Sequence, residues 1–315
     1  MSTLATSESN FSSTVVALVS RRLEEALRAN YVHLAPGNYV AGNRVRDGFN
    51  ALTYVGYQDL AAATTQLTEG TAPTANTLGI VIDTCTASQV GATVEITDLA
   101  AAQSPHQLFE VAANVIADNA AKTYDVLVRE ILNAGASVQY VTASARSLVA
   151  TSNIITGAQV KKMWSILKRN NVPTFADGTY RAIVHPDAVY DLQTDTASGG
   201  WMDVWKYTDN TPLLANEIGR FGGVRFMVSS NAKVFATAGA SSANVYSTVF
   251  FGPDAYVLGD MQSLSTHFVP PGGDHTDPLA QKAIVGWKGA FGCMLLDANG
   301  PRYVRLEHGT TLNLG

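Results

Sequence analysis

The stretch DPLAQKAIVGWKGAFGCMLLD, residues 277–297, decides the fold of this chain. Its most apolar part, residues 283–296, is interrupted by Lys288 and is too short to cross a bilayer, so no membrane span is expected. We interpret it as a strand, with further strand-like stretches on either side, SLSTHFVPP (263–271) and RYVRLEHG (302–309). These late strands need another element to pack on.

That element is predicted upstream as a long helix. Ser104, Pro105 and Gln107 form the capping-box pattern S-x-x-Q with proline at the first helical position. Apolar residues then recur at helical spacing until Gly135, which suits the residue after a helix. They are Leu108, Val111, Ala112, Val115, Ile116, Ala120, Tyr124, Leu127 and Ile131. A helix of this length, roughly 45 Å, is a spine on which the strands pack, and the expected fold class is α+β.

Ahead of the spine helix, the sequence predicts an arm and a long hairpin. Ser13 is a candidate cap for an amphipathic helix that continues to about Asn30. Residues 32–41 read as an extended arm. TYVGYQDL (53–60) and GATVEIT (91–97) alternate at period two around a Thr-, Gly- and Ala-rich middle, which predicts a hairpin with a broad tip. Its small apolar residues favour packing against a partner.

Between the spine helix and the late strands, helices and strands alternate. A helix around residues 156–170 leads to a strand, YRAIVH (180–185), and a short helix, PDAVYDLQ (186–193). Further strands extend the region to about residue 262. The alternation predicts an α/β subdomain.

The composition favours an assembled protein. Charged residues are 15% of the chain, against roughly 25% in ordinary soluble domains, and charge is depleted at the centres of protein interfaces. The net charge is −5 and we identify no basic cluster, so sequence-specific nucleic-acid binding is not expected. Two isolated cysteines exclude a disulfide framework and fit a reducing compartment, and no signal peptide is expected.

Asp274, His275 and Asp277 are candidate metal ligands, because carboxylates and imidazole bind divalent cations. The alternative is a turn, since two glycines precede them and Pro278 follows. We favour the turn, in which these residues act as caps or contact another subunit, and we assign no metal or cofactor.

No catalytic residue is assigned. His185 is explained by the start of a helix at His-Pro-Asp. We identify no local acid or nucleophile as partner for four other histidines, His33, His106, His267 and His308. Gly219, Gly222 and Gly223 match no phosphate-binding pattern and predict a tight turn before a strand. The sequence also lacks the G-x-S-x-G and H-E-x-x-H motifs of hydrolases. An enzyme is not expected.

The order of elements resembles the major capsid protein of tailed bacteriophages, which has the Hong-Kong-ninety-seven-type shell fold. Within that class, four stretches are similar to the N-four-like coat protein family. They are QLTEGTAPTANTLG (66–79), YRAIVHPDAVYDLQTD (180–195), NEIGRFGGVRFMVSS (216–230) and residues 277–297. The similarity covers nearly the whole chain, and the last two stretches are the most specific.

The resemblance implies a structural protein that self-assembles into hexamers and pentamers of an icosahedral shell around double-stranded DNA. It implies an N-arm (1–48), an extended loop (49–100), a peripheral domain (101–140 with 265–315) containing the spine helix, and an α/β axial domain (141–264). The expected location is the virion capsid, assembled in the cytoplasm of the host bacterium. A portal and a cement protein are among the expected partners. A separate scaffolding protein is also expected, because no long charged helical insert, which acts as a built-in scaffold in some relatives, precedes the extended loop.

Some members of this fold crosslink a lysine of the extended loop to an asparagine of a neighbour. Residues 49–100 contain no lysine or arginine, so we expect a shell without that covalent bond. The loop is acidic instead, and we hypothesise that its carboxylates pair with arginines of another subunit, with Glu69 at the tip as the best candidate. The acidic set is Asp59, Glu69, Asp83, Glu95 and Asp98, and the basic set includes Arg21, Arg22, Arg28, Arg44 and Arg46.

Two alternatives stay open. An encapsulin-type nanocompartment shares the fold but encloses cargo enzymes instead of DNA. A metal-dependent hydrolase would use Asp274, His275 and Asp277, and it is the weaker alternative because only one short stretch supports it.

Overall fold

The structure, a computed structural model, describes residues 32–34, 38–39 and 51–313, with gaps at 59, 65, 67–68, 73–74, 104–107, 197–199, 202–216, 274–276, 278 and 297–299. The helix predicted over residues 13–30 and the capping box at 104–107 therefore lie outside the described residues. The chain divides into two compact units. The first comprises Met1–Pro36, Ala87–Ile131 and Gly259–Cys293, and the second comprises Gly37–Thr86, Leu132–Leu258 and Met294–Gly315.

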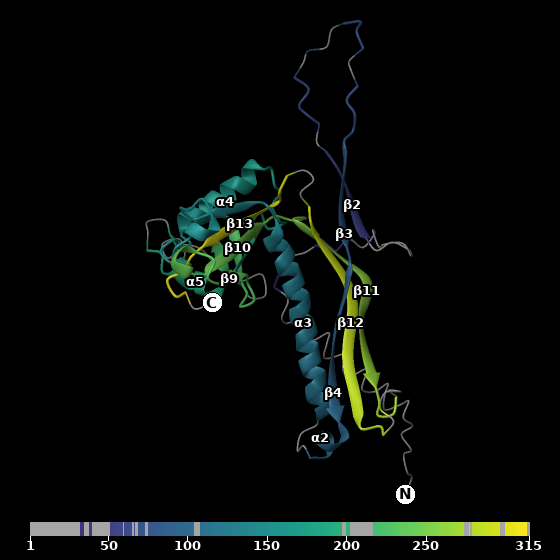
Figure 1. Cartoon of the computed structure of the whole chain (residues 1–315). Helices are drawn as coiled ribbons and strands as arrows, with labels where there is room; N and C mark the ends of the chain where they lie inside the picture. Colours follow the sequence, from purple (N-terminus) through teal and green to yellow (C-terminus); the bar gives the residue numbers. More distant parts are fainter. Residues whose placement is uncertain are drawn as a thin grey trace. The chain divides into compact units, whose positions relative to one another are not determined.

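The first unit is built from a long helix and long antiparallel strands, which Figure 1 shows running alongside one another. Helix α3 (Leu108–Ala134) has 27 residues and ends just before Gly135, as the sequence predicts. Strand β12 (Lys282–Leu295) pairs from Lys282 to Phe291 with β4 (Ser88–Thr97), and β11 (Tyr256–Val269) lies on its other side. A short helix, α2 (Asp98–Gln103), follows β4.

Packing between α3 and β12 is dominated by aromatic side chains. The Tyr124 ring lies 5.9 Å from that of Trp287 and 5.0 Å from that of Phe291. Trp287 Nε1 donates to Asn119 Oδ1 at 3.2 Å, which satisfies the indole in a buried position. The stretch 277–297 is thus a strand packed on the long helix, and this part of the sequence interpretation is confirmed.

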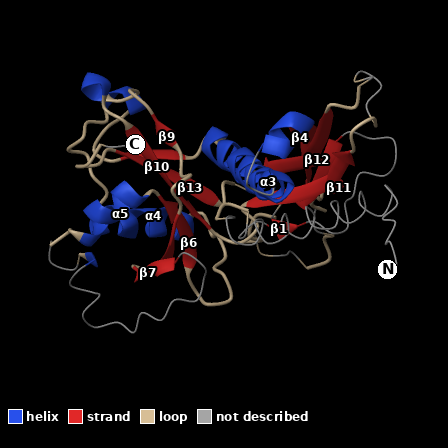
Figure 2. Ribbon diagram, turned by 90° about the horizontal axis from the view of Figure 1, so that it is seen from below, coloured by secondary structure: helices blue, strands red, loops and turns tan. Residues whose placement is uncertain are grey.

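The second unit contains a mixed sheet with the order β5-β13-β10-β6-β8-β7, of which Figure 2 gives a second view. These strands are Val138–Tyr140, Tyr303–His308, Val245–Phe251, Tyr180–Val184, Val224–Val228 and Glu217–Phe221, and the short β9 (Val234–Phe235) pairs with β10. The helices are α4 (Gly157–Arg169) and α5 (Pro186–Gln193), with short 3-10 turns at Arg146–Leu148 and Ala240–Ser242. The predicted α/β region is therefore present. It also contains β13, so the expectation that residues 302–309 pack with the other late strands on the long helix is wrong.

The core of this unit forms where α4 and α5 meet the sheet. Val160, Met163 and Leu167 of α4 are fully buried against sheet residues such as Phe226 and Phe250. Helix α5 begins as the sequence predicts, because Pro186 occupies the first turn and the His185 ring accepts a hydrogen bond from Asp187 N.

A separate two-stranded hairpin also belongs to the second unit. Strands β2 (Ala51–Tyr57) and β3 (Ile80–Thr86) pair in antiparallel register, from Ala51 opposite Thr86 to Tyr57 opposite Ile80. The predicted partner of residues 53–60 is wrong, because residues 91–97 belong to β4 and pair with β12. Strand β3 shows the same alternation of side-chain exposure as β4, and pairing β2 with β3 closes a shorter loop than pairing it with β4. Alternation alone does not specify the partner strand.

Candidate functional site

One face of the β2–β3 hairpin is an exposed apolar surface. Val55 lies opposite Ile82, and Tyr57 lies opposite Ile80. Their exposed fractions are 43% for Val55, 57% for Tyr57 and 58% for both isoleucines. A contiguous group of exposed apolar residues usually marks a surface that binds another molecule. We call these four residues the hairpin face.

The opposite side of the hairpin packs within its own chain. Tyr54 and Cys85 contact a small cluster formed by Val257, Met294 and Leu296. The hairpin therefore uses one side for intrachain packing, and its other side is the exposed hairpin face.

The predicted contact residue Glu69 lies in a turn at the hairpin tip and is exposed. Gly70 follows with φ of 78°, a left-handed conformation that suits glycine at a turn. Asp59 lies outside the described residues, and so do Arg21, Arg22, Arg28, Arg44 and Arg46. Pairing between the acidic and basic sets stays a prediction.

Two other carboxylates of the acidic set have roles within the chain. Glu95 is paired with Lys282 at 3.5 Å, and Asp98 Oδ1 accepts from Leu99 N at 2.6 Å at the start of α2. Asp83 lies on β3 across from Tyr54, and one of its carboxylate oxygens is buried without a hydrogen-bond partner. Glu69 is exposed and forms no ion pair within the part of the chain that the structure describes, so it remains the best candidate of this set for an intersubunit ion pair.

A second exposed apolar surface lies in the first unit. Val111 and Val115 of α3 are 49% and 55% exposed. With Leu108, Val94 and Ile96 they line a shallow groove of about 340 Å³ between α3 and β4. The groove is open and apolar, with few polar groups to orient a small ligand, so it suits a protein contact better than a substrate.

The turn ahead of β12 includes one candidate metal ligand that the structure describes. Asp277 Oδ2 accepts a hydrogen bond from Lys282 N at 2.9 Å, and Asp277 O accepts from Ala280 N at 3.2 Å. This is the turn-capping role that the sequence predicts for Asp277. Asp274 and His275 lie outside the described residues, within which no group of three potential metal ligands occurs.

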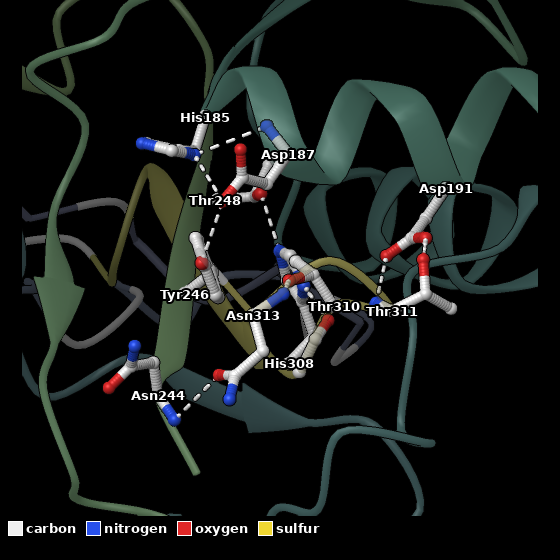
Figure 3. Close-up of polar contacts among 11 residues, drawn as sticks. His185, Asp187, Asp191, Asn244, Tyr246, Thr248, His308, Thr310, Thr311 and Asn313 are labelled. Atoms are coloured by element: carbon white, nitrogen blue, oxygen red, sulfur yellow. Dashed lines mark hydrogen bonds and ion pairs between the residues drawn. The ribbon is translucent and has the colours of Figure 1, made fainter. Parts of the chain in front are cut away.

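A buried polar network surrounds the last described residues of the chain, as Figure 3 shows. His308 is fully buried on β13, with Nε2 2.9 Å from Thr248 Oγ1 and Nδ1 2.8 Å from Gly309 O. Burial lowers the pKa of His308 to about 4, so the ring is neutral at pH 7. Donation from Nδ1 to the carbonyl leaves Nε2 to accept from the threonine hydroxyl.

Asp191 of α5 extends this network to the next residues. Its Oδ2 accepts from Thr311 N at 3.0 Å and its Oδ1 accepts from the Thr311 hydroxyl. Asn244 N donates to Asn313 Oδ1 at 3.1 Å. The segment after β13 is thus fastened to both α5 and the loop before β10.

Charged groups near β13 are also paired. Arg146 forms two hydrogen bonds to Glu307, at 2.8 and 2.6 Å, and this bonding raises the pKa of Arg146. Glu307 is fully buried, and Arg305 Nε lies 3.0 Å from its Oε1. The network joins parts of the fold that lie far apart in the sequence.

The sequence gives no local signal for these partners. Thr248 and His308 are 60 residues apart, and Asp191 and Thr311 are 120 apart. Only the fold brings them together. Similarly, His33 pairs with Asp125, with 2.9 Å between Nδ1 and Oδ2 and both side chains buried in the first unit.

No protein-family model matches the sequence, and no curated protein matches it either. Solved structures do match. The capsid of Ralstonia phage GP4 is 14% identical with a TM-score of 0.66, and the match covers 84% of each chain. The cyanophage Pam1 capsid is 16% identical with a TM-score of 0.68, covering 87% of this chain and 88% of that one.

The chain has the fold of a tailed-phage capsid protein. A virus-like particle from Pyrococcus furiosus is also similar, at 10% identity and a TM-score of 0.51, over 92% of this chain and 98% of that one. The capsid fold expected from the sequence is confirmed. The narrower similarity to the N-four-like coat family stays a prediction.

Proposed function

We propose that this chain is the major capsid protein of a tailed bacteriophage. The observation that carries the proposal is the likeness to phage capsids over more than four fifths of the chain, with a similar share of each capsid chain covered. Subunits form hexamers and pentamers of an icosahedral shell that encloses double-stranded DNA. The protein acts in the virion, is assembled in the bacterial cytoplasm, and catalyses no reaction.

Within this proposal the chain divides into four parts with different roles, as the resemblance to capsid proteins implies. In the proposed assignment residues 1–48 are an N-arm, 49–100 an extended loop, 101–140 with 265–315 a peripheral domain and 141–264 an axial domain. The hairpin face, which is apolar and exposed, is a contact surface with a neighbouring subunit. Glu69 at the tip sets the register of that contact through an arginine of the neighbour.

The shell holds together without a lysine–asparagine crosslink, because residues 49–100 contain no lysine. Non-covalent contacts, or a separate cement protein, then stabilise the shell. A separate scaffolding protein guides assembly and a portal protein admits the DNA.

Expression of the full chain with its scaffolding protein, followed by negative-stain electron microscopy, tests the proposal. Closed shells of uniform diameter are expected. Soluble monomers under all assembly conditions would contradict it.

A nanocompartment shell is the second candidate, favoured by the likeness to the virus-like particle. Particles purified from infected cells distinguish the two functions. Genomic DNA inside them supports the phage capsid, whereas an enclosed enzyme without genomic DNA supports the nanocompartment.

A further inference from the structure

Helix α4 carries a concentration of positive charge in an acidic chain. Its sequence, GAQVKKMWSILKR, contains Lys161, Lys162, Lys168 and Arg169 and no carboxylate. All four cations are exposed. The chain as a whole has 26 acidic and 21 basic residues, so the helix opposes the overall sign. The sequence expectation that no basic cluster exists is wrong for this helix.

Helical geometry places these cations on one face. With about 100° of rotation per residue, an arc of roughly 160° around the helix contains all four cations and one tryptophan. In order around the arc they are Trp164, Lys168, Lys161, Arg169 and Lys162. Trp164, 37% exposed, forms one edge of this arc. The opposite side of the helix is the buried one, with Val160, Met163 and Leu167 in the core. We call the exposed arc the α4 face.

Part of this charge has a structural explanation. Lys168 and Arg169 lie in the last turn, where cations interact favourably with the helix dipole. Lys161 Nζ lies 5.6 Å from the Phe221 ring centroid, and Lys168 Nζ lies 5.9 Å from that of Trp164.

Lys162 and Arg169 take part in neither of these ring contacts. Lys162 lies in the second turn, away from the C-terminus. In the part of the chain that the structure describes, neither Lys162 nor Arg169 has a carboxylate within ion-pair distance. Four like charges on one face repel each other, and an external anion relieves that repulsion.

We propose that the α4 face contacts the phosphate backbone of the double-stranded DNA that the shell encloses. This inference rests on the proposed function. Several lysines and arginines on one helix, with an exposed indole beside them, are the electrostatic footprint of sequence-independent DNA binding. A duplex fits better than an acidic protein, because a protein partner would be expected to bury apolar residues, and Trp164 is the only large apolar side chain on this arc.

Binding of this kind is weak and strongly dependent on salt. Each phosphate contact contributes about −0.9 to the slope of log K against log salt concentration, so four contacts give about −3.6. Raising the salt from about 50 to about 200 mM then weakens binding roughly 150-fold.

Fluorescence anisotropy measures the affinity of the full-length chain for a random-sequence DNA duplex of about 30 base pairs across that salt range. Sedimentation under the same conditions checks that the chain is unassembled, so that DNA reaches every face. The variant Lys162→Glu/Arg169→Glu removes the two cations without partners and leaves the buried side of α4 intact. The slope for this variant is expected to be shallower, at about −1.8 or closer to zero. The same rise in salt then weakens DNA binding by only about 12-fold.

Lys122→Glu is the matched control, because Lys122 is an exposed helical lysine on α3 without an ion-pair partner among the described residues. It should leave the slope unchanged. Equal slopes for the parent chain and the double variant overturn the inference, and so does an equal loss in the control. Preferential binding of the parent chain to a polyglutamate peptide over the duplex also overturns it, in favour of an acidic protein partner.

Electron microscopy of the parent chain and the double variant, each expressed with the scaffolding protein under assembly conditions, separates this inference from the proposed function. If the parent chain assembles shells and the double variant retains full DNA affinity, only the inference fails. If the parent chain never assembles, the proposed function fails whatever the DNA affinity.

Discussion

The double substitution Ile80→Thr/Ile82→Thr tests whether the hairpin face holds the shell together. Both isoleucines are 58% exposed in the isolated chain, so that fraction is available for burial at a contact. Full burial of an isoleucine contributes about 1.5–3 kcal/mol, and the exposed share of two isoleucines therefore contributes about 2–3 kcal/mol per hairpin. Threonine is also β-branched and preserves the strand propensity.

The expected result is a higher critical concentration for assembly with unchanged folding. A loss of about 2–3 kcal/mol corresponds to a weakening of the contact by roughly 30- to 150-fold. The free energy of unfolding of the unassembled chain should change by no more than about 0.5 kcal/mol, because the side-chain atoms that the substitutions remove are exposed. Light scattering against protein concentration gives the first quantity, and urea denaturation gives the second.

Leu148→Thr is the matched control, since Leu148 is also 58% exposed but lies outside the hairpin. Its critical concentration should remain within about twofold of that of the parent chain. A folded double variant that assembles at the parent concentration would refute the reasoning, as would an equal loss in the control.

Other measurements test separate parts of the molecule. Boiled particles in a denaturing gel should give a single band near 33.4 kDa, and a ladder of larger bands would show a covalent crosslink. Glu69→Lys should lower assembly yield without altering subunit stability, and normal assembly would exclude the proposed ion pair. His308 has a folded-state pKa of about 4, below the unfolded value of 6.5, so its stabilising effect is complete above pH 6.5 and is lost as the pH falls toward 4. In urea denaturation the free energy of unfolding of the parent chain should fall by about 3 kcal/mol between pH 6.5 and pH 4 because of this histidine. The variant His308→Gln should lack this part of the fall. Gly289→Ala should lower the free energy of unfolding by about 1–3 kcal/mol, because a new Cβ would clash with Tyr124 Oη, and an unchanged thermal midpoint would contradict that clash.

Local signals explain why much of the fold is predictable from the sequence. Helix α3 has an uninterrupted apolar period, and α5 begins at a proline after a capping histidine. The turn between β7 and β8 uses Gly222 and Gly223, both with positive φ, as expected for a tight turn before a strand. Each of these signals depends on residues close in sequence.

Pairings between distant residues are the part that the sequence does not reveal. The partner of β2 was predicted wrongly because β3 and β4 alternate equally well. His308 looks isolated in the sequence, since Thr248 reaches it only across two paired strands. The basic residues of α4 are visible in the sequence. Lys161 and Lys162 come to lie on the same arc as Lys168 and Arg169 only because the segment is a helix.

The position of β13 in the second unit has a consequence for synthesis on the ribosome. This strand, Tyr303–His308, is inserted between β5 and β10 and pairs with both. Until it has emerged, β10 has an unpaired edge that another nascent chain can extend. Translation that stops short of residue 303 therefore yields a product whose sheet stays open. Folding of this sheet therefore waits until β13 has followed β5 and β10 out of the ribosome, and chains truncated before β13 do not become competent building blocks.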